Sequence, residues 1–518
     1  MYTLGVTATA QPRLFALHLG NGSTTNATTV QGNIVRNITI NTAFITNGSS
    51  AFIGLHIGGG MVTTGTGNTI GSTTTAGSIV INSTGSTIGA LVVGINSASS
   101  STVNVQNNTI AGIDVKATYY GFSAFFNLYP ISLSGAGSPL NVTSNIIGSA
   151  SVENSINLMC GDTTATYNIR GINASSGVTA AQVNIQNNII QNTRLTAPTN
   201  TGGIVTGMYI NPPNNTTVYT VSGNTIRNIS TTSNRNGNAT TNTGLCGILV
   251  LNTNGTVPTT IQTITGNTIH SLVNTSTSAL TGLSTPPYVS GIIFTASNSP
   301  STKSVCSNNI IHSLQINSTG NIAPIVNGIY TNNVALDIFN NSIRLGIDKD
   351  GNSLTNSGHD YRGIFKNTSQ PVSAYNNTIY IGGSGVGTTA TNTAAFFRGN
   401  SNASDDFRNN IFINKRNNAS TGGKHYAIRL NNTTVANCNY NLYYADGTGG
   451  ILGTADAGTT DRIDLTAWQT AMTGDLNSIQ TDATFSNATG NASSVNLTPT
   501  LAGYFPGTSG LFSTTDIN

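Results

Sequence analysis

The chain has 518 residues, a formal net charge of +3 and only 7% charged residues. Such sparse charge argues against nucleic-acid binding through a clustered basic surface, and no run of about 20 apolar residues could insert into a membrane. Hydrophobic residues make up 37%, and their regular spacing argues against disorder. We therefore expect an ordered, loop-rich β protein.

A repeat begins near residue 31. Residues 1–30 show no clear copy of it, and we expect them to form an N-terminal cap or the tail of a preceding module. The repeat is clearest in VSGNTIRNI at 221–229. Its copies align on an anchor Asn, and successive anchors are 31 (410 to 441) to 43 (145 to 188) residues apart. The predicted anchors are Asn33, Asn68, Asn108, Asn145, Asn188, Asn224, Asn267, Asn309, Asn341, Asn377, Asn410 and Asn441.

Aligned on the anchor, the copies favour apolar residues three places before, two after and five after it, as in Val221, Ile226 and Ile229. Polar residues lie between these apolar positions, and this alternation of apolar and polar residues is typical of half-buried strands. The chain is expected to turn a corner between the position three before the anchor and the position two after it. We expect the anchor itself to adopt the left-handed conformation of this corner. Its amide should also hydrogen-bond to the next anchor, about 4.8 Å away, in a structural ladder.

Upstream of each anchor, a small residue precedes an apolar strand, as in Gly207-Met208 and Gly328-Ile329. Short strands, an Asn corner and one long loop per repeat predict an all-β, right-handed parallel β-helix of about 11 to 12 coils over residues 31–450. Cys306 and Cys438 occupy the position three before an anchor, so we interpret them as small core residues.

Residues 451–518 are predicted to form a C-terminal cap. Asp464 is suited to be the N-cap of a short helix, Leu465–Met472, with Leu465, Trp468 and Met472 on one face. An open β-helix end exposes unpaired strand groups, and Trp468, the only Trp, is expected to seal it.

The same end of the chain resembles a known family. CNYNLYY at 438–444, DLTAWQTAMTGDLNSIQTDATF at 464–485 and TTDIN at 514–518 are similar to the closing motifs of right-handed parallel β-helix repeat proteins. The similarity is to the secreted and cell-surface β-helix proteins of Bacteroidetes-type bacteria. Family chains usually continue beyond the last motif, so the resemblance implies a module of a longer extracellular or cell-surface protein.

One outward stripe lies three places after the anchors and is weakly basic and partly aromatic. It could bind a glycan or an anionic polymer through hydrogen bonds, stacking and charge, while the plainer interpretation is a solvated face. The predicted ligand-binding residues are Gln191, Arg227, His270, His312, Arg344 and Tyr380.

The segment DKDGNS at 348–353 resembles the start of a Ca²⁺ loop. It places oxygen ligands at relative positions one, three and five, which are Asp348, Asp350 and Asn352. Gly351 falls at position four, where an EF-hand needs Gly at six, and no Glu follows at position twelve. A solvated turn is therefore favoured, and Ca²⁺ is the only cofactor that the sequence suggests.

Composition also bears on function. Only 16 Asp and Glu are available, and although Asp405 and Asp406 are adjacent, no second carboxylate pair falls in register with them, so we assign no catalytic residue. We expect a structural or adhesive module that contacts polysaccharide, cells or copies of itself. The alternatives are a pectate-lyase-like polysaccharide lyase or glycoside hydrolase, and an ice-binding or self-assembling filament protein.

Overall fold

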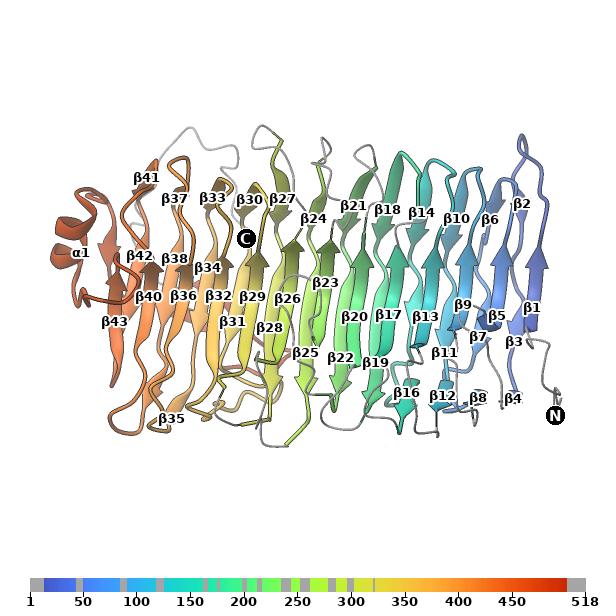
Figure 1. Ribbon diagram of the computed structural model, residues 1–518, viewed down its shortest axis with the longest axis horizontal. Coiled ribbons are helices and arrows are strands. Elements are labelled where there is room, and N and C mark those ends of the chain that lie inside the picture. Colours follow the sequence, from blue (N-terminus) through green and yellow to red (C-terminus); the bar gives the residue numbers. More distant parts are fainter. Residues whose placement is uncertain are drawn as a thin grey trace. The chain divides into compact units, whose positions relative to one another are not determined.

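The computed structural model describes residues 14–42, 50–83, 91–117, 125–161, 166–174, 178–197, 203–211, 217–233, 244–251, 261–277, 286–295, 302–319 and 322–500. The chain divides into two compact units. Unit 1 consists of Met1–Thr256 with Val273–Ser278, and unit 2 of Val257–Leu272 with Ala279–Asn518. Each unit is a parallel β-solenoid in which successive coils add strands to each of three sheets, here named A, B and C (Figure 1). Each coil adds one strand to a sheet, except that the first four coils of unit 1 each add two short strands to sheet C.

In unit 1 the strands of each sheet follow chain order and pair in parallel. Sheet A contains β1 (Leu14–Leu19), β5 (Ser50–Ile57), β9 (Leu91–Ser97), β13 (Phe125–Leu133), β17 (Thr166–Ala174), β20 (Gly203–Ile210) and β23 (Leu245–Leu251). Sheet B contains β2 (Thr28–Thr29), β6 (Val62–Thr63), β10 (Val103–Gln106), β14 (Leu140–Thr143), β18 (Gln182–Gln186) and β21 (Val218–Ser222). Sheet C contains β3 (Ile34–Val35), β4 (Ile38–Thr42), β7 (Thr69–Gly71), β8 (Ile79–Ser83), β11 (Thr109–Ala111), β12 (Ile113–Ala117), β15 (Ile146–Ile147), β16 (Ile156–Cys160), β19 (Ile189–Thr196) and β22 (Thr225–Thr231).

Unit 2 has the same three sheets. Sheet A contains β26 (Tyr288–Thr295), β29 (Ile325–Thr331), β32 (Asp360–Lys366), β36 (Thr393–Arg398), β40 (His425–Leu430) and β43 (Gly450–Thr454). Sheet B contains β24 (Thr263–Thr265), β27 (Ser304–Ser307), β30 (Leu336–Phe339), β33 (Val372–Tyr375), β37 (Asp406–Arg408) and β41 (Asn437–Asn439). Sheet C contains β25 (Thr268–Asn274, whose last two residues belong to unit 1), β28 (Ile310–Ile316), β31 (Ser342–Leu345), β34 (Thr378–Ile381), β38 (Ile411–Asn414), β42 (Leu442–Ala445) and β44 (Ile479–Gln480).

Strand pairing begins earlier in the chain than the visible repeat. β1 pairs in parallel with β5, and β2 pairs in parallel with β6. Residues 14–29 therefore already contribute strands to sheets A and B. The first 13 residues lie outside the described part of the chain.

The predicted Asn ladder is present in both units. In unit 1, Asn145 donates from its backbone N and its Nδ2 to Oδ1 of Asn188, at 3.0 and 2.9 Å, and accepts the same two bonds from Asn108. The second Nδ2 hydrogen of Asn145 reaches the carbonyl of Val105, three residues before the preceding anchor, at 2.9 Å. Asn341 in unit 2 repeats this pattern between Asn309 and Asn377. Each buried amide is thus fully hydrogen-bonded, as burial of a polar group requires.

The left-handed residue of the corner is not the anchor, which corrects the expectation from the sequence. Positive φ angles occur one residue earlier, at Asn187 (56°) and Gly223 (66°) in unit 1 and at Asn308 (55°) and Asn340 (54°) in unit 2. Asn and Gly tolerate this conformation best. The turn at this preceding residue leaves the anchor side chain free to point into the corner and join the ladder.

The small residue in sheet A has a packing role. A Cβ added to Gly328 would lie 2.5 Å from Cγ2 of Ile343, the residue two places after anchor Asn341. Gly207 stands in the same relation to Ile226 in unit 1, at 2.7 Å. Within a coil, the glycine of sheet A therefore leaves the space that the Ile side chain of sheet C fills in the core. The core positions predicted from the repeat, including Cys306 and Cys438, are buried.

The C-terminal helix closes the solenoid of unit 2 as predicted. α1 spans Leu465–Met472, and its N-cap Asp464 accepts a hydrogen bond from the backbone N of Ala467 at 2.8 Å. Trp468 is fully buried, with its ring centroid 6.0 Å from that of Tyr443. Met472 is buried beside it on the same face of the helix.

A buried carboxylate completes this cap. The backbone N of Asn441, the last ladder residue, donates to Oγ of Ser478, and Ser478 donates to Asp475. Asp475 also accepts hydrogen bonds from Nε1 of Trp468 at 2.6 Å and from the Tyr443 hydroxyl at 2.8 Å. Burial raises the pKa of the Asp475 carboxyl to about 6, although these hydrogen bonds oppose the shift.

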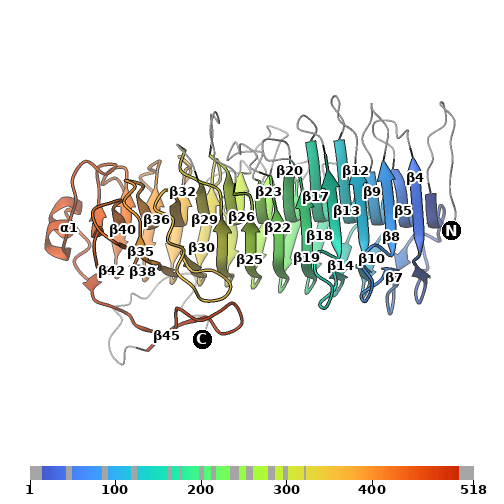
Figure 2. The same ribbon diagram turned by 90° about the horizontal axis from the view of Figure 1, so that it is seen from below.

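Beyond α1 the chain turns back along unit 2. We call residues 482–500 the strap; it contains β45 (Phe485–Asn487) and β46 (Asn496–Pro499), which pair antiparallel. Figure 2 shows β45 beside the strands of unit 2, away from α1. A second small sheet joins β35 (Ser384–Val386) and β39 (Asn417–Asn418). The strap was not foreseen within the predicted cap, and the TTDIN motif at 514–518 lies outside the described residues.

Candidate functional site

The stripe predicted from the sequence is in register within each unit. In unit 2, the rings of His270 and His312 stack with centroids 4.8 Å apart. His312 then pairs with Arg344, and Arg344 with Tyr380, on adjacent parallel strands. In unit 1, Gln191 pairs with Arg227, whose Nε and Nη2 donate to Oε1 of Gln191 at 3.0 and 2.8 Å.

Most of the stripe is buried, which corrects the expectation of a solvated ridge. Relative exposure is 3% for Gln191, 3% for His312, 1% for Arg344 and 7% for Tyr380. Only Arg227 and His270 are half-buried. A ligand-binding role for these six residues stays a prediction. In unit 2, a binding site built on them would also include the strap, which covers them.

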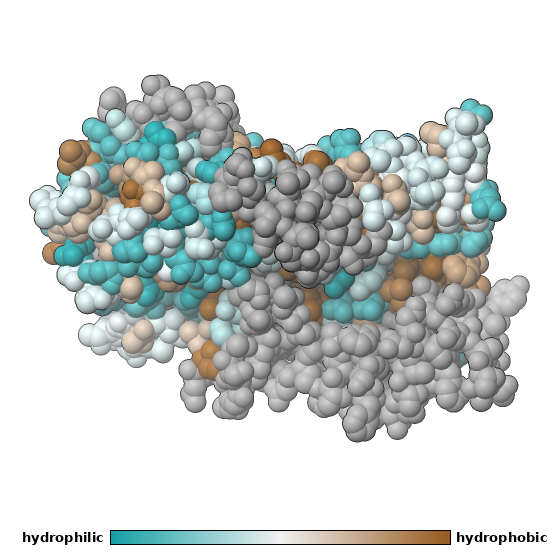
Figure 3. Space-filling view, turned by 45° about the horizontal axis from the view of Figure 1, so that its top comes forward, coloured by the Kyte–Doolittle hydropathy of each residue, from teal (hydrophilic) through white to brown (hydrophobic). Residues whose placement is uncertain are grey.

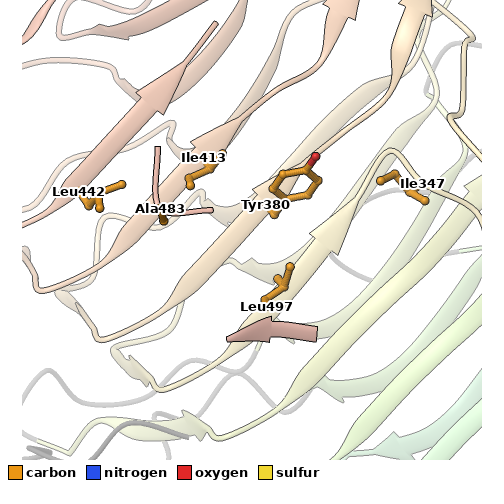
Figure 4. Close-up of a cluster of buried hydrophobic side chains, with 6 residues drawn as sticks. All are labelled: Ile347, Tyr380, Ile413, Leu442, Ala483 and Leu497. Carbon is orange, nitrogen blue, oxygen red and sulfur yellow. The ribbon is translucent and has the colours of Figure 1, made fainter. Parts of the chain in front are cut away.

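The strap covers the stripe of unit 2. Ala483 and Leu497 are buried against Tyr380, Ile413 and Leu442 of sheet C (Figure 4). The Phe485 ring meets Tyr380 edge-on, with centroids 5.8 Å apart. The backbone of the strap is also attached to the rest of unit 2, because the N of Ala492 donates to the carbonyl of Lys349 at 2.8 Å. At the start of the strap, Asp482 forms an ion pair with Lys415.

Arg344 is the main polar link between sheet C and the strap. Its Nη1 donates to the carbonyls of Ala488 (3.3 Å) and Gly490, and its Nη2 donates to Oγ of Ser313 (2.7 Å) and the carbonyl of Asp348 (3.1 Å). None of the ion pairs in the described part of the chain involves Arg344. Its buried Nε has no hydrogen-bond partner. Burial lowers the pKa of its guanidinium to about 10, which still leaves it charged at neutral pH.

The neighbouring titratable groups are held neutral. Burial, with smaller contributions from His270 and Arg344, lowers the pKa of His312 to about 3. Burial also raises the pKa of Tyr380 to about 12, and Asp482 and Asp446 act in the same direction. Under the strap, Arg344 is therefore the charged member of the stripe at neutral pH.

A cavity of about 180 Å³ lies between the stripe and the strap. Its floor is formed by outward residues of β28, β31 and β34, and its roof by strap residues 495–499. The floor residues are Ile310, Ile311, His312, Ser342, Arg344 and Thr378. It is smaller than the 300 Å³ or more typical of pockets for drug-sized ligands, but it has room for several water molecules or one small polar group.

The residues of the predicted Ca²⁺ loop are already hydrogen-bonded to one another. Oδ1 of Asp348 accepts from the backbone N of Asp350 (2.9 Å) and of Asn352 (2.8 Å), and Oδ2 accepts from Nδ2 of Asn352 at 3.2 Å. The Asp350 carboxylate forms an exposed ion pair with Lys349. The described residues contain no group of three or more His, Cys, Asp or Glu that could hold a metal ion.

Asp405, weighed above as a carboxylate for catalysis, lies in a buried ion cluster. Its Oδ2 is 3.1 Å from Nζ of Lys366 and 3.5 Å from Nη1 of Arg398, and all three side chains are fully buried. Its Oδ1 accepts from the backbone N of Val372 at 3.0 Å. Two adjacent coils supply this cluster, Lys366 from one and Arg398 and Asp405 from the next, so no local motif indicates it. Asp406 is bound separately, by Arg408 and the Tyr375 hydroxyl.

The strap was missed for a different reason. Two short alternating segments, at 485–487 and 495–499, flank the turn-forming stretch TGNAS at 489–493, which is a hairpin signal. The signal shows that a hairpin forms, but not which face of the solenoid receives it.

Comparisons with protein-family models, with curated proteins and with solved structures find no match to this chain. In the described residues, no helix has the length and apolar character needed to cross a bilayer.

Proposed function

We propose that this chain is a structural and adhesive β-solenoid module of an extracellular or cell-surface protein, and that it contacts neutral polysaccharide through rows of outward amides. The resemblance of its C-terminal motifs to surface β-helix proteins of Bacteroidetes-type bacteria is consistent with this location. The ladders support a scaffold role, because they fix every coil through uncharged groups.

The observation that carries the adhesive part is a row of outward amides in unit 1. Asn104, Asn141 and Asn184 stand opposite one another in sheet B, and their side chains form Nδ2 to Oδ1 bonds of 2.7 Å. All three are half-buried, so water still reaches them. Such amides present donors and acceptors in one line, and sugar hydroxyls can bond to both.

The surface has the composition that this role needs. On the face in Figure 3, hydrophilic and hydrophobic residues are interspersed, and the hydrophobic ones form small separate patches. A second outward amide pair, Asn41 and Asn82, lies in sheet C of the same unit at 2.7 Å. Hydrogen bonding over many coils, with little charge, favours weak and multivalent contact with a polymer.

A polysaccharide array with the purified chain tests the proposal, read for both retention and released oligosaccharide. We expect retention without release, and weaker retention when Asn104, Asn141 and Asn184 are all replaced by Ala. Replacing Asn41 and Asn82 by Ala removes only the two-residue amide pair of sheet C and should weaken retention less than loss of the three-residue row. Release of oligosaccharide would favour the lyase or hydrolase alternative, and absence of retention on every glycan would contradict the adhesive role.

A further inference from the structure

Arg344 is a buried cation without a carboxylate partner. Its two terminal nitrogens bond only to neutral oxygens, and its Nε, also buried, has no hydrogen-bond partner. Elsewhere in unit 2, buried Arg398 and Lys366 share Asp405 as a counter-charge. Buried Arg416 also lacks a carboxylate, but it bonds to carbonyl oxygens and lies over the Tyr361 ring. Arg344 differs in its unbonded Nε and in the cavity beside it, and an anion in that cavity would offset the cost of the buried charge.

The cavity beside Arg344 has the lining that such an anion needs. Ser342 lines it from β31, the strand of Arg344 itself, while Thr378 and His312 line it from the two adjacent strands, β34 and β28. No carboxylate side chain lines it. The acidic loop residue Asp348 accepts bonds from its own loop with both carboxylate oxygens, and its charge raises the pKa of Arg344 by less than burial lowers it.

We propose that this cavity binds one small oxyanion of the carboxylate, sulfate or phosphate class, held by Arg344 and the hydroxyls of Ser342 and Thr378. The anion lies between sheet C and the strap, so its binding fastens the strap to unit 2. The volume of about 180 Å³ accommodates the charged group but not a chain of sugar rings. A free inorganic anion and the acidic group of a polymer are both chemically suited, and the site does not depend on the proposed contact with neutral polysaccharide.

Calorimetric titration of the full chain in a Tris chloride buffer tests the site. Sodium phosphate, sodium sulfate and a short oligogalacturonate are each titrated at matched ionic strength, with sodium chloride as the blank. We expect saturable binding at one site per chain for at least one of the three. Binding of the inorganic ions would show that a free anion fills the site, whereas binding of the oligogalacturonate alone would show that a polymer carries the anion.

Three variants assign the binding to this cavity. Arg344→Gln should weaken binding about tenfold or more, since hydrogen bonds to charged groups are the strong ones. Ser342→Leu fills the cavity from an outward strand position and leaves the bonds from Arg344 to the strap in place, so it tests the site even if Arg344→Gln does not fold. Arg227→Gln changes the Arg of the same stripe in unit 1 and should bind as the wild type does. Absence of saturable binding, or equal binding by Ser342→Leu, would overturn the proposal.

Discussion

The two units share a corner but differ on the outward face of sheet C. In unit 1 this face leaves Ile34 and Ile146 exposed, at 63% and 38%, and in unit 2 the first described strands do the same with Ile310, at 37%. In unit 2 the corresponding face carries the strap, and Ile413 and Leu442 beneath it are almost fully buried. The repeat therefore determines how each coil closes, whereas a segment outside the repeat determines which coils are covered.

The interiors of the units differ in the same way. Among the described residues, the buried Asp, Lys, Arg and His side chains all belong to unit 2. They include the cluster of Asp405, Lys366 and Arg398, and Arg416, which donates to the carbonyls of Leu354 and Asn356. In unit 2 a charged side chain is thus buried where nearby residues supply an ion-pair partner or carbonyl acceptors. In unit 1 the buried corners contain neutral amides.

The largest effect is expected at the corner that the units share. Asn145→Ala in unit 1 would leave Asn108 N without its acceptor and Val105 O without its Nδ2 donor, and would remove one bond each from Nδ2 of Asn108 and Oδ1 of Asn188. At about 1 kcal/mol or more for each buried group, the free energy of unfolding should fall by about 4 kcal/mol. Asn341→Ala should have a similar effect in unit 2, measured by urea denaturation of each variant.

The matched control for this prediction lies in the same coil. Asn141 bonds to Asn104 and Asn184 with the same amide geometry as the ladder, but on the outward face. Water can replace its partners, so Asn141→Ala should cost less than about 1 kcal/mol. Equal losses for Asn141→Ala and Asn145→Ala would show that burial of the corner is not what makes the ladder stabilising.

The corner was also the part most readily predicted from the sequence. The apolar positions and the anchor Asn recur in every coil, and the ladder needs the same residue at the same place, so the pattern is visible in a single sequence. The prediction failed at the residue before the anchor, because Ser144, Asn187 and Gly223 differ in type and share only a positive φ. The helix and Trp468 were predictable because N-cap chemistry and helical spacing are local.

The candidate site was predictable only in its register. Residues three places after the anchors align because the coils align, and this part of the prediction is confirmed. Their burial depends on the strap, which is about 144 residues away in sequence where Ala488 meets Arg344. Contacts of that range have no periodic signature. The ion cluster around Asp405 was missed for another reason, because its charged residues occur in two adjacent coils alone and do not repeat along the chain.

A smaller effect is expected from pH at the cap that unit 2 alone shows. The pKa of Asp475 is about 6 in the folded chain and near 3.9 when unfolded, so between these values the folded state binds more protons. The free energy of unfolding should therefore fall as pH rises from about 4 to about 6, by about 2 kcal/mol, and then stay level. Urea midpoints measured across this range check the prediction.

Asp475→Asn provides the control for the cap. Asp475 has a φ of 62°, a conformation that Asn tolerates, so the backbone need not change. The variant keeps one acceptor and loses the titration, and its stability should vary less with pH in this window. A pH profile identical to that of the wild type would assign the effect to another group.

The smallest effect on overall stability is expected from loosening the strap, since it covers unit 2 without contributing to a corner. Leu497→Ala removes contacts with Tyr380 and Ile413, and should raise the opening equilibrium of the strap about tenfold, or about 1.4 kcal/mol. Faster hydrogen exchange at the amide of Ala492, which bonds to the carbonyl of Lys349 outside the strap, would report this opening. Thr498→Ala, at an exposed neighbouring position, should leave this amide protected. Because the ladder residues stay paired when the strap opens, the urea midpoint should hardly change. A urea midpoint lowered as far as that of Asn341→Ala would contradict this, because it would mean that the strap and the corner unfold together. The strap would then stabilise the core of unit 2 as well as cover its surface.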